Sequence, residues 1–385
     1  SAALRSGPTE FWVVVDPKTW QVSYICRAGA IGPTVNHYGR YRDAGGFQFA
    51  YRDYRYLLGL GMAFCDVQAV EPRSSSDDER FALEANWETD ARFDRKAGTR
   101  ITTRRTKAGL LMVQARINGR KARWFLLDSG TSTMAILPTA ADKLGMPTTL
   151  AGKADLLGQE QDAIFRTADN FTLGQMTIPR VLLLQFDMSK FASLQGIDMA
   201  GVCGYDLFRR ALVELDAGRG VVEIHDPHSY ENNQARWEPF SYHRRVPCIR
   251  CRFEGEREGL FEIDTGDGDS VFFRGPAVRH FGLRGEGWTA EGLNADMSGN
   301  ITRCRRGSLG WFDLGGTRVA PLSGVRLALD DENDVPYDEH QPAGTIGLGL
   351  LSRFKVIFDY PHKRIGFIKQ PDANKGAATT QKAEH

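Results

Sequence analysis

The sequence predicts an all-β protein with two similar β-barrel-like lobes that follow an N-terminal extension. Three observations carry this prediction: an internal repeat, a hairpin pattern inside each copy of the repeat, and a surplus of glycine. Glycine accounts for 41 of the 385 residues, without a G-X-Y period. Such a surplus is typical of chains with many tight turns and many short strands.

The internal repeat begins with two segments that align without a gap. LMVQARINGRKARWFLLDSG occupies 111–130 and PCIRCRFEGEREGLFEIDTG occupies 247–266, so equivalent residue numbers differ by 136. Two further matches follow in the same order: FTLG at 171–174 with FDLG at 312–315, and GVCGYDLFRRALVELD at 201–216 with GTIGLGLLSRFKVIFD at 344–359. Three collinear matches predict two related units.

Each copy of the first segment has the pattern of a β-hairpin. Two apolar-rich runs flank a glycine turn, at Asn118-Gly119 in the first copy and at Glu254-Gly255 in the second. Glycine and asparagine tolerate the positive φ angles that tight hairpin turns need. The second run of each hairpin leads into an Asp-Ser/Thr-Gly tripeptide, which begins at Asp128 and at Asp264.

The repeat also sets the expected domain boundaries. We expect an N-terminal extension of unassigned role at 1–105 with a charged linker at 72–105, a first lobe at 106–228, a connector at 229–245, a second lobe at 246–370 and a disordered tail at 371–385. Within the extension, strand-like runs occur at 11–15 and 21–26, and a short helix is predicted near 78–87.

Composition and charge argue against several classes of function. Lys and Arg number 49 and Asp and Glu 48, so no net field attracts nucleic acid, and we expect no nucleic-acid partner. No apolar run approaches the ~18 residues of a spanning helix, so no membrane span is expected. The six cysteines are too sparse for a disulfide framework. We expect a periplasmic or secreted protein, with the cytoplasm as the alternative.

Two strand-end aspartates in related positions suit acid–base chemistry. A carboxylate at the end of a buried strand is costly to ionise, and a second carboxylate beside it raises its proton affinity further. Two such groups related by an approximate two-fold axis can share one proton. One can then take a proton from water while the other protonates a carbonyl oxygen.

This pattern resembles the aspartic protease family, the pepsin-like and retropepsin-like peptidases. LLDSGTS at 126–132 fits the family motif completely, EIDTGDG at 262–268 fits through its first glycine, and GVCG at 201–204 and TIG at 345–347 resemble a later apolar-apolar-Gly element. The resemblance covers about 107–369. It implies an aspartic-type endopeptidase that needs no cofactor, with a peptide or protein substrate and with Asp128 and Asp264 as the catalytic pair.

The resemblance implies further roles around the pair. Ser129 and Thr265 would cross-link the two loops through hydroxyl-to-backbone hydrogen bonds, and Thr131 would bond the outer oxygen of Asp128. Gly130 and Gly266 would permit the sharp turn after each aspartate. The family's flap tyrosine has no counterpart between residues 128 and 203, and flaps are expected near 150–164 and 289–303.

Asp267 departs from the family pattern, which has Ser or Thr at this position. A hydroxyl there would stabilise ionised Asp264, whereas an ionised Asp267 would raise the proton affinity of the pair. The alternative is that Asp267 faces solvent or pairs with an arginine such as Arg274. This departure also supports a second interpretation of the chain, a catalytically silent peptide-binding or inhibitor protein.

Other features favour structural explanations. The C-x-x-C at 248–251 is expected to pack, or to form a disulfide with a distant cysteine, and the acidic stretch 330–334 is expected to be a solvated loop, so no metal site is predicted. Because both lobes lie on one chain, a monomer suffices. The extension at 1–105 is nearly neutral, which favours a structural appendage or partner surface over an inhibitory pro-segment.

Overall fold

The structure is a computed structural model that describes residues 2–6, 9–27, 34–43, 48–57, 60–66, 90–156, 159–283, 288, 290–297, 301–329 and 336–370. It is mostly β, with 51% strand and 10% helix. Two compact units are present, one of Ser1–Trp87 with Thr148–Phe165 and one of Glu88–Pro147 with Arg166–His385. The helix predicted near 78–87, the acidic stretch 330–334 and the tail at 371–385 lie outside the described residues.

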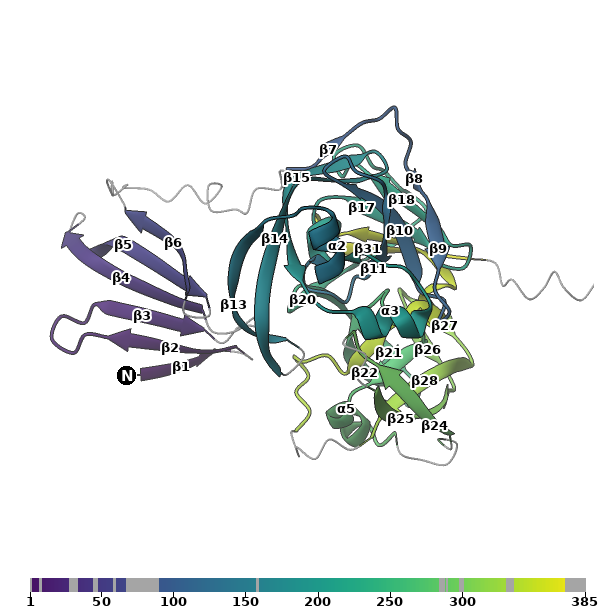
Figure 1. Cartoon of the computed structure of the whole chain (residues 1–385). Helices are drawn as coiled ribbons and strands as arrows, with labels where there is room; N and C mark the ends of the chain where they lie inside the picture. Colours follow the sequence, from purple (N-terminus) through teal and green to yellow (C-terminus); the bar gives the residue numbers. More distant parts are fainter. Residues whose placement is uncertain are drawn as a thin grey trace, which may run out of the picture. The chain divides into compact units, whose positions relative to one another are not determined.

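Six antiparallel strands form one layer in the N-terminal part of the chain (Figure 1). They are β1 (Ala2–Ser6), β2 (Thr9–Val15), β3 (Val22–Arg27), β4 (Thr34–Asp43), β5 (Gln48–Leu57) and β6 (Leu60–Asp66), each paired with the next. The strands expected at 11–15 and 21–26 are confirmed as β2 and β3. None of the described side chains between 13 and 53 is fully buried, so cross-strand contacts such as the stacked rings of Tyr24 and His37 contribute to holding the layer.

Hairpins occupy both ranges in which flaps were expected. The first consists of β13 (Thr148–Leu156) and β14 (Gln159–Leu173), and the second of β24 (Ala290–Ala295) and β25 (Ile301–Leu309). The role of these segments as flaps stays a prediction. The structure alone assigns no substrate contact to either hairpin.

The first lobe is a closed barrel of six strands. Along the barrel the order is β14, β10, β11, β16, β12 and β15, and β15 pairs again with β14. The elements of this lobe are β10 (Leu111–Ile117), β11 (Arg123–Leu127), β12 (Ala135–Ile136), α2 (Pro138–Lys143), β15 (Met176–Gln185), α3 (Ser189–Gln195), β16 (Gly201–Cys203) and α4 (Tyr205–Phe208).

The second lobe repeats this strand order with two interruptions. The equivalent of β14 is split into β25 and β26, and the equivalent of β15 is split into β27 and β28, so the described strands form an open path. The further elements are β20 (Ser241–His243), β21 (Val246–Phe253), β22 (Arg257–Ile263), β23 (Val271–Phe273), α5 (Gly275–His280), β26 (Phe312–Leu314), β27 (Thr317–Val319), β28 (Leu322–Ala328), β29 (Gly344–Ile346) and α6 (Leu348–Leu351).

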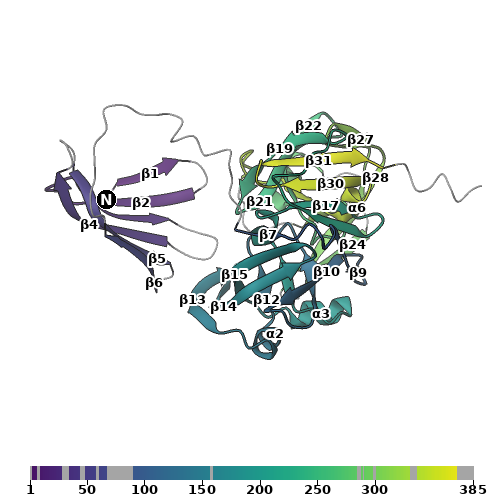
Figure 2. The ribbon, with the colours of Figure 1, turned by 90° about the horizontal axis from the view of Figure 1, so that it is seen from above.

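A third sheet joins the two lobes, and Figure 2 shows its strands β17, β30 and β31 side by side. Its order is β19 (Arg236–Pro239), β31 (Arg364–Lys369), β30 (Phe354–Asp359), β17 (Leu212–Asp216), β18 (Val221–His225) and β8 (Arg100–Ile101). Val213 pairs with Phe358 and Leu215 with Val356. Because Val213 and Val356 are equivalent in the repeat, as are Leu215 and Phe358, the two copies meet here with local two-fold symmetry.

Residues 90–105 differ from the expected charged linker. They contain β7 (Arg92–Phe93), β8 and β9 (Thr103–Arg105), which pair with β15, β18 and β10 respectively. Ile101 supplies a buried side chain within this charged stretch. Alternating apolar and charged residues let short strands pair at sheet edges, a pattern too brief for sequence periodicity to detect.

Candidate active site

Two buried central strands carry the sequence-predicted aspartates. Strand β11 ends at Leu127 and β22 ends at Ile263, both with fully buried side chains. Each strand lies between an antiparallel hairpin partner and a parallel glycine-containing strand, β16 in the first lobe and β29 in the second. The amide of Asp128 donates to Cys203 O at 3.0 Å and that of Asp264 to Ile346 O at 2.9 Å, so both loops begin at equivalent positions.

Ser129 and Thr265 cross-link the two loops reciprocally. The hydroxyl of Ser129 donates to Ile263 O at 2.7 Å and accepts from the amide of Thr265 at 3.0 Å. The hydroxyl of Thr265 donates to Leu127 O at 2.8 Å and accepts from the amide of Ser129 at 3.0 Å. Both residues are buried, so the four bonds form in a low-dielectric environment where they orient the loops strongly.

The two carboxyl groups meet across these loops. A Cβ placed on Gly130 would stand 2.6 Å from Asp264 Oδ2, and one placed on Gly266 would stand 2.6 Å from Asp128 Cγ. Each carboxyl group therefore lies against the backbone of the opposite loop. The structure brings together both aspartates and all four of these Ser, Thr and Gly residues, as the sequence predicted.

The hydrogen bonds to the two carboxyl groups differ. Asp128 accepts from the amide of Gly130 at 2.8 Å on Oδ1 and from the hydroxyl of Thr131 at 2.7 Å on Oδ2. Asp264 accepts from the amide of Gly266 at 2.7 Å on Oδ1. Burial raises the pKa of Asp264 well above its ordinary value, and the carboxylates of Asp128 and Asp267 raise it further.

Asp267 is paired, but with a partner that the sequence did not indicate. Arg326, which is 3% exposed on β28, donates through Nη2 to both carboxylate oxygens of Asp267, at 2.6 and 2.5 Å. Arg274, the arginine named as an example, instead donates to Glu262 at 2.5 Å. Arg326 lies 59 residues beyond Asp267, so no local pattern could have indicated the pair.

The glycine that follows each parallel strand packs on the aspartate loop. A Cβ on Gly204 would stand 2.7 Å from Thr131 O, and one on Gly347 would stand 2.7 Å from Asp267 O. The short helices α4 and α6 begin directly after these glycines. This close approach explains the apolar-apolar-Gly element in physical terms, since any side chain there would displace the loop.

An aromatic cluster near the pair was missed by sequence reasoning. The rings of Tyr205, Phe208, Phe240 and Tyr242 surround Tyr360, with centroids 5.3 to 6.1 Å from its own. Burial raises the pKa of Tyr360 well above its ordinary value, and the charges of Tyr242 and of both aspartates act in the same direction. The contributing residues come from distant segments, so only the fold reveals the cluster.

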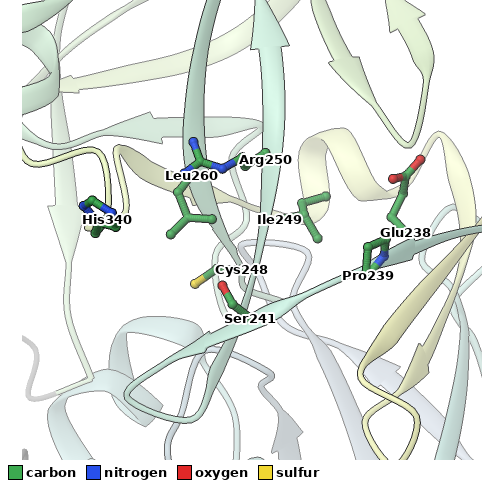
Figure 3. A pocket seen from close by; sticks show the side chains of 8 residues that line it. All are labelled: Glu238, Pro239, Ser241, Cys248, Ile249, Arg250, Leu260 and His340. Carbon is green, nitrogen blue, oxygen red and sulfur yellow. The ribbon is translucent and has the colours of Figure 1, made fainter. Parts of the chain in front are cut away.

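Two cavities lie away from the aspartate loops. One of about 360 Å³ opens on the second lobe, where Figure 3 shows Cys248 beside Ser241, its partner in the β20–β21 ladder. Leu260 and His340 also line it. The other, of about 370 Å³, lies between α2 and α3 of the first lobe. Neither is lined by a residue of the two motifs.

The cysteines are free thiols among the described side chains. Cys248 and Cys251 form no disulfide, which settles the C-x-x-C in favour of packing. Burial raises the pKa of Cys248 to about 12, with a further contribution from Glu262, so its thiol is a poor nucleophile and metal ligand at neutral pH.

One acidic cluster in the described part of the chain has the composition of a metal site. Ligand atoms of Glu214, Glu223 and His225 lie within 4.8 Å of one another. The ammonium group of Lys355 pairs with Glu214, and the Tyr230 hydroxyl donates to the same carboxylate at 2.6 Å. The positive charge that this cluster needs is therefore supplied by a lysine side chain.

Comparison with known proteins agrees with the geometry. A family model described as "Aspartyl protease" matches residues 113–206, which include the first aspartate loop and the glycine element that packs on it. A comparison with curated proteins gave no match. None of the helices in the described residues is long and apolar enough to cross a membrane.

Proposed function

Because residues 113–206 form an aspartyl protease domain, we propose that the chain is an aspartic endopeptidase with Asp128 and Asp264 as its catalytic pair. The reciprocal contact of the two carboxyl groups with the glycines of the opposite loops is the observation that carries this proposal. It extends the family match at the first lobe to a two-lobed site. A peptide or protein is the substrate class that the family implies.

The pair can hydrolyse a peptide bond with one water and one shared proton. The ionised carboxylate takes a proton from the water as the water oxygen bonds to the carbonyl carbon. The π electrons of the carbonyl move to its oxygen, which takes the proton of the neutral carboxyl group. In the second step the amide nitrogen takes the proton held by the first carboxyl group, and the C–N bond breaks. One hydroxyl of the intermediate then gives its proton to the second carboxylate, which restores both groups.

Electrostatic surroundings support this chemistry. A raised pKa at Asp264 keeps one carboxyl group of the pair protonated at pH values where ordinary aspartates are ionised. The buried bonds between Ser129 and Thr265 hold the two loops in fixed register, which limits reorganisation during the reaction. The pair therefore has both an acid and a base in place before substrate binds.

Substitution of each aspartate tests the proposal. We expect Asp128→Asn and Asp264→Asn to remove nearly all cleavage of a fluorogenic peptide library, and a statine-type inhibitor to block the parent protein. Asp169→Asn, which changes an exposed aspartate of the first lobe, is the matched control and should retain full activity. Substantial turnover by either folded catalytic variant contradicts the assignment.

The same variants separate the enzyme from a silent peptide-binding protein. A binding protein would show no turnover in the parent chain, and Asp128→Asn would leave its peptide affinity largely unchanged. The enzyme would show turnover in the parent and lose it in the variant. Peptide binding measured by fluorescence anisotropy alongside cleavage distinguishes these two outcomes.

A further inference from the structure

The two aspartate loops differ at the third position after the aspartate. Thr131 donates its hydroxyl to Asp128 in the first loop, whereas the second loop has Asp267 at this position. The backbone is the same in both, because Thr131 O accepts from the amide of Tyr205 at 2.9 Å and Asp267 O accepts from that of Leu348 at 2.7 Å. A carboxylate thus replaces a hydroxyl donor without a change in the loop.

Arg326 supplies the counter-charge for this carboxylate. Both oxygens of Asp267 accept from its Nη2, and its Nε lies 2.7 Å from Asp269 Oδ2, while its side chain is only 4% exposed. Burial raises the pKa of Asp267, and the guanidinium opposes that effect. An ionised Asp267 is the form that a buried guanidinium binds best.

The first lobe has a neutral residue at the position of Arg326. Ala135 pairs with Leu184 between the parallel strands β12 and β15, and Phe272 pairs with Arg326 between the equivalent strands β23 and β28. Ala135 and Phe272 are equivalent because they pair with equivalent residues of β16 and β29. Leu184 is therefore the structural counterpart of Arg326. A hydroxyl and a buried apolar side chain in the first lobe correspond to an ion pair in the second, so both members of the pair differ together.

We propose that the ion pair of Asp267 with Arg326 places the shared proton of the catalytic pair on Asp264, which makes Asp264 the acid and Asp128 the base. This inference rests on the proposed function. Hydrogen bonds reach both oxygens of Asp128, from Gly130 and Thr131, and such bonds favour a charged carboxylate.

Asp264 has the opposite surroundings. It accepts a bond from the amide of Gly266, and the carboxylates of Asp128 and Asp267 act on it with repulsive charge. A neutral Asp264 relieves this repulsion. Asp267 and Arg326 touch no reacting atom in this scheme, so they act as positioning residues.

The remaining charges around Asp267 balance one another. Arg306 from β25 donates to both oxygens of Asp269 at 3.2 Å, which continues the alternation of charges away from the pair. The charges of both aspartates act on Tyr360, beyond β30, and its raised pKa keeps its hydroxyl neutral. Among these groups, Asp128 and Asp267 are the two carboxylates whose charges raise the pKa of Asp264.

In the proposed reaction the proton movements have fixed directions. Asp128 removes a proton from the attacking water, and Asp264 gives its proton to the carbonyl oxygen as the carbon–oxygen bond forms. When the C–N bond breaks, Asp128 gives its proton to the leaving nitrogen, and a hydroxyl of the intermediate returns one to Asp264. The cycle ends with both carboxyl groups in their starting forms.

The test replaces the ion pair of the second lobe with the two residues that occupy the same positions in the first lobe. In Asp267→Thr/Arg326→Leu both charges are removed together, so no buried charge is left unpaired. We expect the basic limb of the pH profile of kcat/KM, which follows loss of the proton from Asp264, to move to lower pH by about half a unit or more, because the negative charge next to Asp264 is gone. Glu258→Gln, an exposed carboxylate of the same lobe, is the control and should leave the limb in place.

A readout independent of turnover separates this inference from the proposed function. In protein with ¹³C-carboxyl aspartate, resonances assigned from the Asp→Asn variants should show Asp264 protonated at a pH where Asp128 is ionised. The double variant should reduce that difference. If the parent protein cleaves peptides but Asp128 is the protonated member of the pair, the inference is overturned and the proposed function stands. Protonated Asp264 without turnover overturns the proposed function alone.

A conservative variant covers the case in which the double variant does not fold. Asp267→Asn keeps the shape of the side chain and an oxygen acceptor for Arg326, and should move the basic limb in the same direction. A purely structural role predicts lower kcat and lower thermal stability with an unmoved limb. An unmoved limb in a folded, active variant overturns the inference.

Discussion

The backbone of Gly130 lies against the carboxyl group of Asp264, so a Cβ on Gly130 would stand 2.6 Å from Asp264 Oδ2. Gly266 makes the equivalent contact with Asp128. Neither glycine has a positive φ angle. Each glycine is required because the carboxyl group of the opposite loop lies against its backbone. This close approach replaces the expected reason, a sharp turn. Each lobe thereby contributes to the position of the carboxyl group of the other.

Gly130→Ala should therefore inactivate the proposed enzyme. The added methyl group must displace Asp264, and a displacement of about 1 Å can cost about 100-fold in rate. We expect kcat/KM to fall by at least about 100-fold, measured with a fluorogenic peptide. Gly39→Ala is the control, because a Cβ there would meet no atom within 4 Å. Near-parental activity of Gly130→Ala would contradict the close contact.

The sequence allowed prediction of the parts of the site that are local. The aspartate, hydroxyl and glycine of each motif are consecutive, and the repeat predicted that two such loops would face each other. Asp267 was identified as a departure, but its partner Arg326 was not, because that contact depends on the register of β23 against β28. Register of parallel strands that are far apart in sequence is a property of the folded sheet.

The reciprocal hydroxyl bonds predict a stability effect. Ser129→Ala leaves Ile263 O and the amide of Thr265 without their buried partner, at about 1–3 kcal/mol for each group. The free energy of unfolding should fall by about 2 kcal/mol or more, measured by urea denaturation. Thr265→Val should have a similar effect. The swapped variants Ser129→Thr and Thr265→Ser keep a hydroxyl and should stay close to the parent. Parental stability of Ser129→Ala would show that the four bonds contribute little.

Much of the fold could also be predicted from the sequence, because the sequence signals for it are local. Hairpin turns such as Asn118-Gly119, which both have positive φ, follow from backbone sterics. The pairing of β17 with β30 joins the two copies of the repeat. It brings together residues that are far apart in sequence, such as Lys355 and Glu214, which are separated by 141 positions. Short edge strands such as β7 and β9 depend on neighbouring strands already in place. Local propensity contains no information on such pairings.

The N-terminal extension leads to a prediction about activation. Residues 1–105 contain 15 Lys and Arg against 13 Asp and Glu, so they lack the strong positive charge that would favour binding to an acidic cleft. We expect the full chain to cleave peptides without prior processing. The measurement compares freshly purified full chain, verified by mass spectrometry, with protein treated by limited proteolysis. Activity that appears only after removal of this region would assign it an inhibitory role.

The joining sheet predicts a pH dependence of stability. His225 lies on β18, its Nε2 is buried, and its ring centroid lies 4.8 Å from that of Tyr230. Burial lowers the pKa of His225 below its ordinary value of 6.5, although Glu214 and Glu223 act in the opposite direction. The unfolded chain therefore binds a proton that the folded chain resists. Stability is fully present above pH 6.5 and declines as the pH falls below it.

Replacement of this histidine isolates its contribution. His225→Phe keeps an aromatic ring beside Tyr230 and removes the titration, so the free energy of unfolding should decline less between pH 7 and pH 5 than in the parent, with a limit of about 1.4 kcal/mol per pH unit. Asp264 has a raised pKa and acts in the opposite direction, but it is present in both proteins and cancels from the difference. His340→Gln changes an exposed histidine and should keep the parental slope. Equal slopes for parent and His225→Phe would show that His225 accepts its proton as readily in the folded sheet as in the unfolded chain.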